Sequence, residues 1–176
     1  MAAVDTEGET MVENQRMRRG IGLAVVVLPL LVVSLIARQQ AAVPYPAEYR
    51  NWAVVKTSLV SPQAPNYAAR GGFHHFYANA KAMDGYRTGA FPEGSIIVDE
   101  GVYAEDAKGV VVERGRRSLD VMHKNSATHA ATGGWGFEHF DGDSQVGSGT
   151  ADARSSCATC HAQRKAQDYV FSAFRR

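Results

Sequence analysis

The stretch RRSLDVMHK, residues 116–124, decides the fold, because its apolar and polar side chains alternate. In an extended chain the two faces would carry Leu119, Val121 and His123 on one side and Ser118, Asp120 and Met122 on the other. Alternation with a period of two residues is typical of a β-strand that packs one face against a core. We therefore predict a strand here.

Four further stretches combine aromatic and β-branched residues and are bounded by glycine or proline, which is typical of strands. They are YRNWAVVKTSLV at 49–60, FHHFYAN at 73–79, SIIVDEGVY at 95–103 and GGWGFEHF at 133–140. In the last of these, Trp135, Phe137 and His139 would share one face, whereas Glu138 and Phe140 would share the other.

Helices are expected at two places. Residues 80–87 precede a Thr-Gly pair that would end a short helix, and residues 154–167 contain no glycine or proline. Between 105 and 115 we expect a charged loop. The whole pattern predicts an α+β fold, mostly antiparallel β-sheet, with short helices and one helix near the C-terminus.

The chain has 176 residues, enough for one compact domain plus extra segments. Its 19 Lys and Arg nearly balance 18 Asp and Glu, so there is no basic excess to neutralise a run of phosphates. We therefore exclude nucleic acid as a partner. Two cysteines cannot form a disulfide scaffold, so the core must come from apolar packing, helped by any cofactor.

The N-terminal region contains an uncharged stretch, GIGLAVVVLPLLVVSLIA. As a helix it would be about 27 Å long, close to the hydrocarbon thickness of a bilayer. Three arginines precede it and one follows, which places the main domain in the periplasm, anchored to the inner membrane. The alternative is a cleaved signal peptide and a soluble periplasmic protein. The predicted segments are a cytoplasmic leader at 1–19, a transmembrane signal-anchor at 20–37, a linker at 38–46 and the exported domain at 47–176.

One motif carries chemistry, Cys157-Ala158-Thr159-Cys160-His161 in the last predicted helix. Two thiols at this spacing can bond to the two vinyl groups of one haem, and the following histidine can then bind the iron as proximal ligand. We predict one haem c per chain, held by Cys157 and Cys160, with His161 on the iron.

Three other chemistries use paired cysteines. A thioredoxin-like dithiol should open a helix after a buried strand, but polar residues precede Cys157 here. A structural disulfide is the second alternative, and the protein would then carry no haem. A zinc site would need two more ligands, and none of the other histidines is at zinc-finger spacing.

The sixth iron position is predicted to be open. No methionine follows His161, and Met83 and Met122 are more simply explained as core residues. An iron with an open or water-filled distal face can bind gases or oxidise small substrates.

Several segments resemble the cytochrome P-460 family, in the family's order, over about residues 45–174. They are YRNW at 49–52, YRTGAFPEGSII at 86–97, LDVM at 119–122, TGGWGF at 132–137, CATCH at 157–161 and DYVF at 168–171. The resemblance implies a mostly antiparallel β fold, a homodimer and one covalently bound haem with a vacant distal site. In the enzymes of the family it implies oxidation of hydroxylamine, whereas the related cytochromes c′-β bind nitric oxide.

The family enzymes also carry a lysine that is cross-linked to the porphyrin, in or before the Tyr-basic-Thr-Gly turn. Here the turn holds Arg87, and a permanently protonated guanidinium is a poor nucleophile. Lys81, just upstream, is the nearby substitute, and the alternative for it is an ordinary solvated lysine.

A hydroxylamine oxidase needs a base that takes protons while electrons leave through the haem to an accepting cytochrome. Glu138 and Asp120 are the candidates, with Glu138 preferred, and the alternative for each is a carboxylate on a solvated sheet face. His74 and His75 point to opposite faces, so at most one can line the pocket. The predicted function is a haem-dependent oxidoreductase acting on hydroxylamine or a similar small nitrogen compound. The alternative is a nitric oxide binding protein without turnover.

Overall fold

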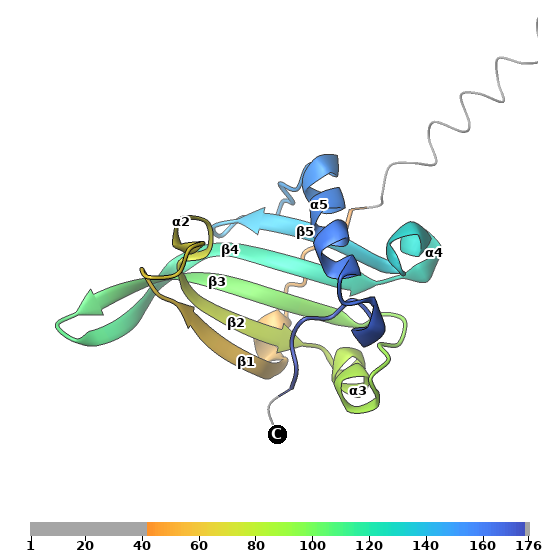
Figure 1. The fold of residues 1–176 in the computed structure, drawn as a ribbon, viewed down its shortest axis with the longest axis horizontal. Helices are drawn as coiled ribbons and strands as arrows, with labels where there is room; N and C mark the ends of the chain where they lie inside the picture. Colours follow the sequence, from red (N-terminus) through yellow and green to blue (C-terminus); the bar gives the residue numbers. More distant parts are fainter. Residues whose placement is uncertain (1–41, 175–176) are drawn as a thin grey trace, which may run out of the picture. The chain divides into compact units, whose positions relative to one another are not determined.

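A computed structural model describes residues 42–174, which lie within a compact unit spanning Gln40–Arg176. Its centre is one antiparallel sheet in which each strand pairs with the next along the chain (Figure 1). The strands are β1 (Ala53–Val60), β2 (Gly72–Ala78), β3 (Ile96–Ala107), β4 (Val110–Lys124) and β5 (Trp135–Asp141). The predicted α+β class with a mostly antiparallel sheet is confirmed.

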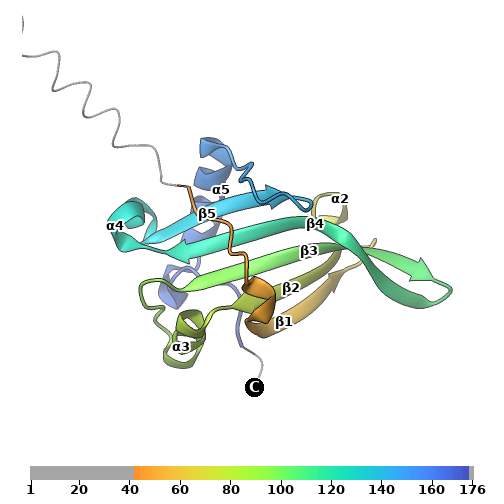
Figure 2. The ribbon, with the colours of Figure 1, turned by 180° about the vertical axis from the view of Figure 1, so that it is seen from behind.

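The helical elements are short and lie around this sheet. They are η2 (Tyr49–Asn51), α2 (Tyr67–Arg70), α3 (Ala80–Thr88), α4 (Ser126–His129), η3 (Ala130–Thr132), α5 (Ala151–Ala162) and η4 (Lys165–Gln167). We call the side of the sheet that carries Phe76, Met122 and Phe137 the front face, and α5 packs on this side (Figure 1). The back face carries Tyr77, Val121 and Glu138, and the segment that leads into β1 crosses it (Figure 2).

Both faces of the sheet are apolar at their centre, so both are covered. On the front face Met122, Trp135 and Phe137 pack with residues of α3 and with Val170 of the C-terminal tail. On the back face Leu119 and Phe140 pack with Val43 and Tyr49. Val43 is only 4% exposed, so the end of the predicted linker that the structure describes is irregular but belongs to the core.

The helix predicted at 80–87 is confirmed as α3, and its ends have clear local causes. The Asn79 side chain accepts a hydrogen bond from the Ala82 amide at 2.9 Å, which satisfies a free donor of the first turn. At the other end Gly89 adopts φ +84°, a left-handed conformation that glycine allows without a steric penalty. The two signals together fix the length of the helix.

The charged loop predicted between 105 and 115 is wrong. β3 and β4 continue through this region as a long hairpin arm, with only Lys108 and Gly109 between them. Arg114 of β4 donates to Glu105 of β3 at 2.7 and 2.8 Å, so charged side chains of the arm pair between its two strands. Much of the arm is exposed, so its residues lack the apolar alternation by which a strand is recognised.

Two other boundaries differ from the prediction. The stretch from Tyr49 begins with η2, and strand β1 starts only at Ala53. The helix predicted at 154–167 runs instead from Ala151 to Ala162, because the Thr150 side chain caps it by accepting from the Ala153 amide at 3.1 Å. The chain then turns through η4.

Between residues 42 and 174 no helix is long and apolar enough to cross a bilayer. The leader predicted at 1–19 and the signal-anchor predicted at 20–37 lie outside the described residues, as does the start of the predicted linker.

Candidate haem-attachment site

Helix α5 presents the cysteine and histidine motif beside the front face. Cys157 and His161 are four residues apart and therefore share one side of the helix, with Cys160 next to them. Both thiols are exposed and neither is in a disulfide. Ala158, between the cysteines, packs against the front-face core and holds the helix on the sheet.

The His161 ring is fixed by one hydrogen bond and two aromatic contacts. Its Nδ1 lies 2.7 Å from the Tyr169 carbonyl oxygen, and its centroid lies 4.9 Å from that of Phe137 and 5.0 Å from that of Phe171. A carbonyl oxygen can only accept, so Nδ1 carries the hydrogen and Nε2 keeps its lone pair. Burial lowers the pKa of His161, which favours the neutral ring. A neutral imidazole oriented by a backbone carbonyl is the usual form of a metal-binding histidine.

The Tyr169 carbonyl reaches α5 because the chain reverses just before it. Asp168 and Tyr169 have φ values of +50° and +67°, which non-glycine residues rarely adopt. The Asp168 carboxylate stabilises this reversal by accepting from the Phe91 amide at 2.8 Å and from Lys124 Nζ at 2.7 Å. Residues from three distant parts of the chain therefore determine where the His161 ring points.

Asp120 of β4 lies close enough to the motif for its charge to act on it. Although Cys157 is an exposed residue, partial desolvation raises the pKa of its thiol, and the Asp120 charge is the next cause. The Asp120 charge also raises the pKa of His161, against the larger lowering by burial. Asp120 Oδ1 is 2.6 Å from His139 Nδ1, and its Oδ2 is 3.8 Å from Arg70 Nη1. The structure therefore brings Asp120 together with the motif.

Arg70, which the sequence did not single out, links Asp120 to a second carboxylate. It donates to Asp99 Oδ2 at 2.5 Å, and Asp99 Oδ1 is 2.8 Å from His74 Nδ1. His74 Nε2 is 2.7 Å from the Arg70 carbonyl oxygen, so both ring nitrogens face acceptors. The hydrogen bond to Asp99 raises the pKa of His74. His74 is therefore an ion-pair partner on the front face, whereas His75 lies on the back face near Thr57 and Glu113.

Glu138, the other predicted base, is not brought to this site. It lies on the back face, where Arg154 Nη2 approaches its Oε2 at 2.5 Å and the Gly149 amide donates to its Oε1 at 3.0 Å. Its side chain is 1% exposed. The contacts tie α5 and the preceding loop to β5, which is a structural role.

Lys81, the predicted cross-link residue, is exposed on α3, and its Nζ lies beside Gly94 in the turn before β3. No contact joins it to α5 among the described residues. Arg87 is paired with Asp84 on the same helix. The front face instead holds Lys56 of β1, whose Nζ is 4.6 Å from the Phe76 ring centroid. A bulge between Val54 and Lys56 shifts the register there, so alternation alone could not place this lysine.

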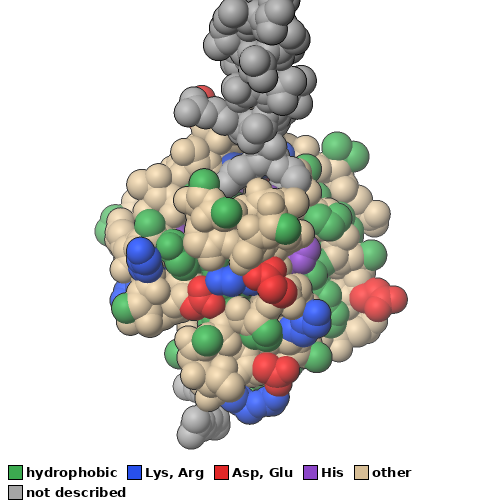
Figure 3. Space-filling model, turned by 90° about the vertical axis from the view of Figure 1, so that its right-hand side faces the viewer, with side chains coloured by type: hydrophobic (Ala, Val, Ile, Leu, Met, Phe, Trp, Pro, Cys, Tyr) green, Lys and Arg blue, Asp and Glu red, His purple; other side chains and the backbone are tan. Residues whose placement is uncertain are grey.

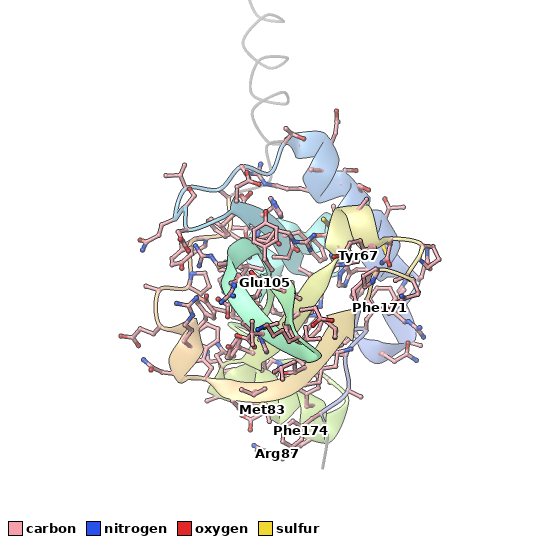
Figure 4. The ribbon with its side chains drawn as sticks, turned by 90° about the vertical axis from the view of Figure 1, so that its left-hand side faces the viewer. Tyr67, Met83, Arg87, Glu105, Phe171 and Phe174 are labelled. Atoms are coloured by element: carbon pink, nitrogen blue, oxygen red, sulfur yellow. The ribbon has the colours of Figure 1, made fainter. Side chains whose placement is uncertain are left out.

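The residues present fit a haem. Two exposed thiols, an imidazole with a free Nε2 and exposed aromatic surface lie on one side of the sheet. Figure 4 shows Tyr67 of α2 and Phe171 of the tail on this same side, and both are exposed apolar surface that a porphyrin could cover. Over residues 42–174 no three His, Cys, Asp or Glu side chains are arranged to hold a metal ion, so the zinc alternative gains no support.

A family model, Cytochrome P460, matches residues 46–172. The chain belongs to the cytochrome P460 family. The resemblance recognised from the motifs is thus confirmed, and membership implies a haem cofactor that binds small ligands. This cytochrome P460 family member matches no curated protein in the comparison made. Attachment through Cys157 and Cys160 remains a prediction, and so does ligation by His161.

Proposed function

We propose that this cytochrome P460 family member is a haem c oxidoreductase that oxidises hydroxylamine or a similar small nitrogen compound. Cys157 and Cys160 would hold the haem by thioether bonds, and His161 would bind the iron through Nε2. When bound, the haem supplies an iron that accepts electrons from the substrate nitrogen and passes them to an electron-accepting cytochrome.

The observation that carries this proposal is the position of Asp120. Its carboxylate lies on the front face with the motif, and its Oδ1 is held by His139. Protons must leave the substrate nitrogen as electrons are removed from it, and a carboxylate at this place can accept them on Oδ2. Glu138 cannot do so in this arrangement, because Arg154 and Gly149 occupy its oxygens on the other face.

The proposal includes an open sixth position on the iron, which the contacts of nearby side chains support. Met122 is buried in the front-face core and Met83 packs against the same core. His74 and His139 are held by Asp99 and Asp120. Among the described residues these side chains are therefore committed to other contacts, which leaves the iron accessible to a small ligand.

Nitric oxide binding of the cytochrome c′-β kind is the second candidate. It is favoured by the position of Lys81, which is exposed beside Gly94 and has no contact with α5 among the described residues. Without a lysyl cross-link the haem would have an ordinary c-type attachment, as expected of a gas-binding member.

The proposal further includes export, an anchor at 20–37 and a homodimer. The exposed apolar side chains of the hairpin arm support association of two copies: Tyr103, Val110 and Val111 are 54%, 62% and 43% exposed. Acidic and basic side chains are interspersed on the face that Figure 3 shows. This mixture offers no single-sign surface for nucleic acid there.

The decisive experiment measures hydroxylamine oxidation by the haem-loaded protein with an artificial electron acceptor. Asp120→Asn keeps the shape of the side chain but removes the base, and we expect turnover to fall about 100-fold or more. Asp143→Asn is the matched control, because Asp143 is an exposed carboxylate away from the motif, and it should retain wild-type turnover. Nitric oxide binding without hydroxylamine turnover in the wild type would favour the second candidate.

A further inference from the structure

His139 bridges two carboxylates on the front face. Its Nδ1 is 2.6 Å from Asp120 Oδ1, and its Nε2 is 3.1 Å from Asp141 Oδ1. Ionised carboxylates only accept hydrogen bonds, so both ring nitrogens must donate, which requires the imidazolium form. The hydrogen bond to Asp120 raises the pKa of His139 to about 9, in agreement with this geometry.

The bridge is built into the sheet. Asp120 and His139 are directly opposite each other in the β4–β5 register, so their side chains meet on the front face without any change of backbone. Asp141 lies at the end of β5 and is largely exposed. Ser148 of the following loop donates its amide to the His139 carbonyl at 2.8 Å, which steadies the histidine backbone.

The charged groups around this bridge come from several elements. Arg70 of α2 approaches Asp120 Oδ2 at 3.8 Å, and Asp99 of β3 binds the same guanidinium. Cys157 of α5 is within the influence of the Asp120 charge. His139 therefore holds Asp120 at Oδ1, while Oδ2 lies 3.8 Å from Arg70 Nη1.

We propose that His139 is a positioning residue, which fixes the rotation of the Asp120 carboxylate so that Oδ2 can accept a proton from the substrate. This inference rests on the proposed oxidase function and goes beyond it, because it assigns a role to a residue that the reaction itself does not use. A carboxylate that turned about its Cβ–Cγ bond would present Oδ2 in a different direction, and small misplacements of a catalytic group are costly.

Two substitutions separate the two hydrogen bonds of the ring. In His139→Asn the amide nitrogen can take the place of Nδ1 and keep the bond to Asp120. In His139→Gln the longer side chain places its amide nearer Nε2 and keeps only the bond to Asp141. We expect the asparagine variant to retain most of the hydroxylamine turnover, and the glutamine variant to lose about 10- to 100-fold.

A second readout does not depend on turnover. In the ferrous, carbon monoxide-bound protein, which is diamagnetic, ¹⁵N resonances of the His139 ring report its protonation as pH is varied. We expect the wild-type ring to lose its proton near pH 9, and the Asp120→Asn variant to lose it at clearly lower pH. Asp141→Asn should lower the pKa of the His139 ring less than Asp120→Asn does, because Asp141 is the more exposed partner.

Equal turnover of the asparagine and glutamine variants would overturn the inference, as would a His139 ring that is neutral at pH 7. Failure of the wild type to oxidise hydroxylamine would instead overturn the proposed function. In that case the affinity of the ferric protein for hydroxylamine decides whether His139 positions Asp120. A weaker affinity in His139→Gln than in His139→Asn supports the positioning role, and equal affinities reject it.

Discussion

At the residue scale, one carbonyl oxygen defines the chemistry of His161. The Tyr169 carbonyl takes the Nδ1 hydrogen and leaves Nε2 for a metal. The two thiols next to it are exposed and unpaired, as thioether formation with a haem requires. The motif thus contains a histidine ring oriented for metal binding and two accessible thiols.

Attachment of the haem is the first prediction at this scale. Changing both Cys157 and Cys160 to Ala should abolish covalent haem, which is detected by haem staining of a denaturing gel. Ser155→Ala with Ser156→Ala, on the same helix, should leave the stained band intact. A stained band in the cysteine double variant would contradict attachment through these thiols.

His129 gives the second prediction, which concerns stability against pH. The residue is 4% exposed, its ring packs on Gly136, and its Nδ1 has no hydrogen-bond partner among the described residues. Burial lowers the pKa of His129. Below pH of about 6.5 the unfolded chain takes up a proton here that the folded protein resists, so stability falls as pH falls through this range.

The measurement compares melting temperatures from pH 7.5 to 5. His129→Gln cannot take up this proton, so its melting temperature should fall less steeply with pH than that of the wild type. Thr128→Ser, on the same short helix, should keep the wild-type dependence. Parallel curves of melting temperature against pH for the wild type and His129→Gln would show that protonation of His129 does not contribute to the pH dependence of stability.

At the scale of elements, α5 is attached to the sheet on two sides. Ala158 packs on the front-face core, and Arg154 reaches Glu138 on the back of β5. The Glu138 carboxylate is almost fully buried, so its charge is compensated by Arg154 and by the backbone amides of His139 and Gly149. The contacts of Glu138, which we predicted to be catalytic, thus attach α5 to the sheet.

We therefore predict that Arg154→Ala destabilises the domain by about 3 kcal/mol, because it leaves a buried carboxylate without its cation. Urea unfolding followed by circular dichroism measures this loss. The matched control is Arg114→Ala, which breaks an exposed pair on the hairpin arm and should leave the midpoint unchanged. A similar midpoint for the Arg154 variant and the control would mean that the buried pair contributes nothing.

At the scale of the whole molecule, the sheet separates two functions. Its back face is closed by the segment before β1, where the buried Tyr49 and the exposed Arg50 donate to the buried Glu100 at 2.6 and 2.5 Å. Its front face carries the motif, Asp120 and Arg70. The back face therefore has a structural role, whereas we propose that the front face, besides its own packed core, holds the haem and its ligand.

The proposed open position on the iron gives the last prediction. Electron paramagnetic resonance of the resting ferric protein should show a high-spin signal, because the described methionines belong to the core and His74, His75 and His139 are bound to carboxylates. Met122→Ala serves as a control and should not change the spin state. A purely low-spin signal would mean that a protein side chain occupies the sixth position and would favour electron transfer.

The sequence by itself determined the strands, the α+β class and the haem motif. Alternating residues such as Leu119 and Val121 identify a strand locally, and the spacing of Cys157 to His161 alone predicts an attachment site for haem. These features depend on neighbours along the chain, so they can be read without the fold. The hairpin arm could not be predicted from the sequence, because its exposed residues show no alternation of apolar and polar side chains.

Only the tertiary structure decided which side chains share a face with the motif. From the sequence we preferred Glu138 to Asp120, but strand register puts Asp120 beside His139 on the front face and Glu138 beside Arg154 at the back. Arg70 reaches the front face from the four-residue helix α2 and Lys56 from a strand with a bulge, and neither feature leaves a periodic signal. Such positions depend on contacts between residues far apart in the chain, and these contacts exist only once the sheet has formed.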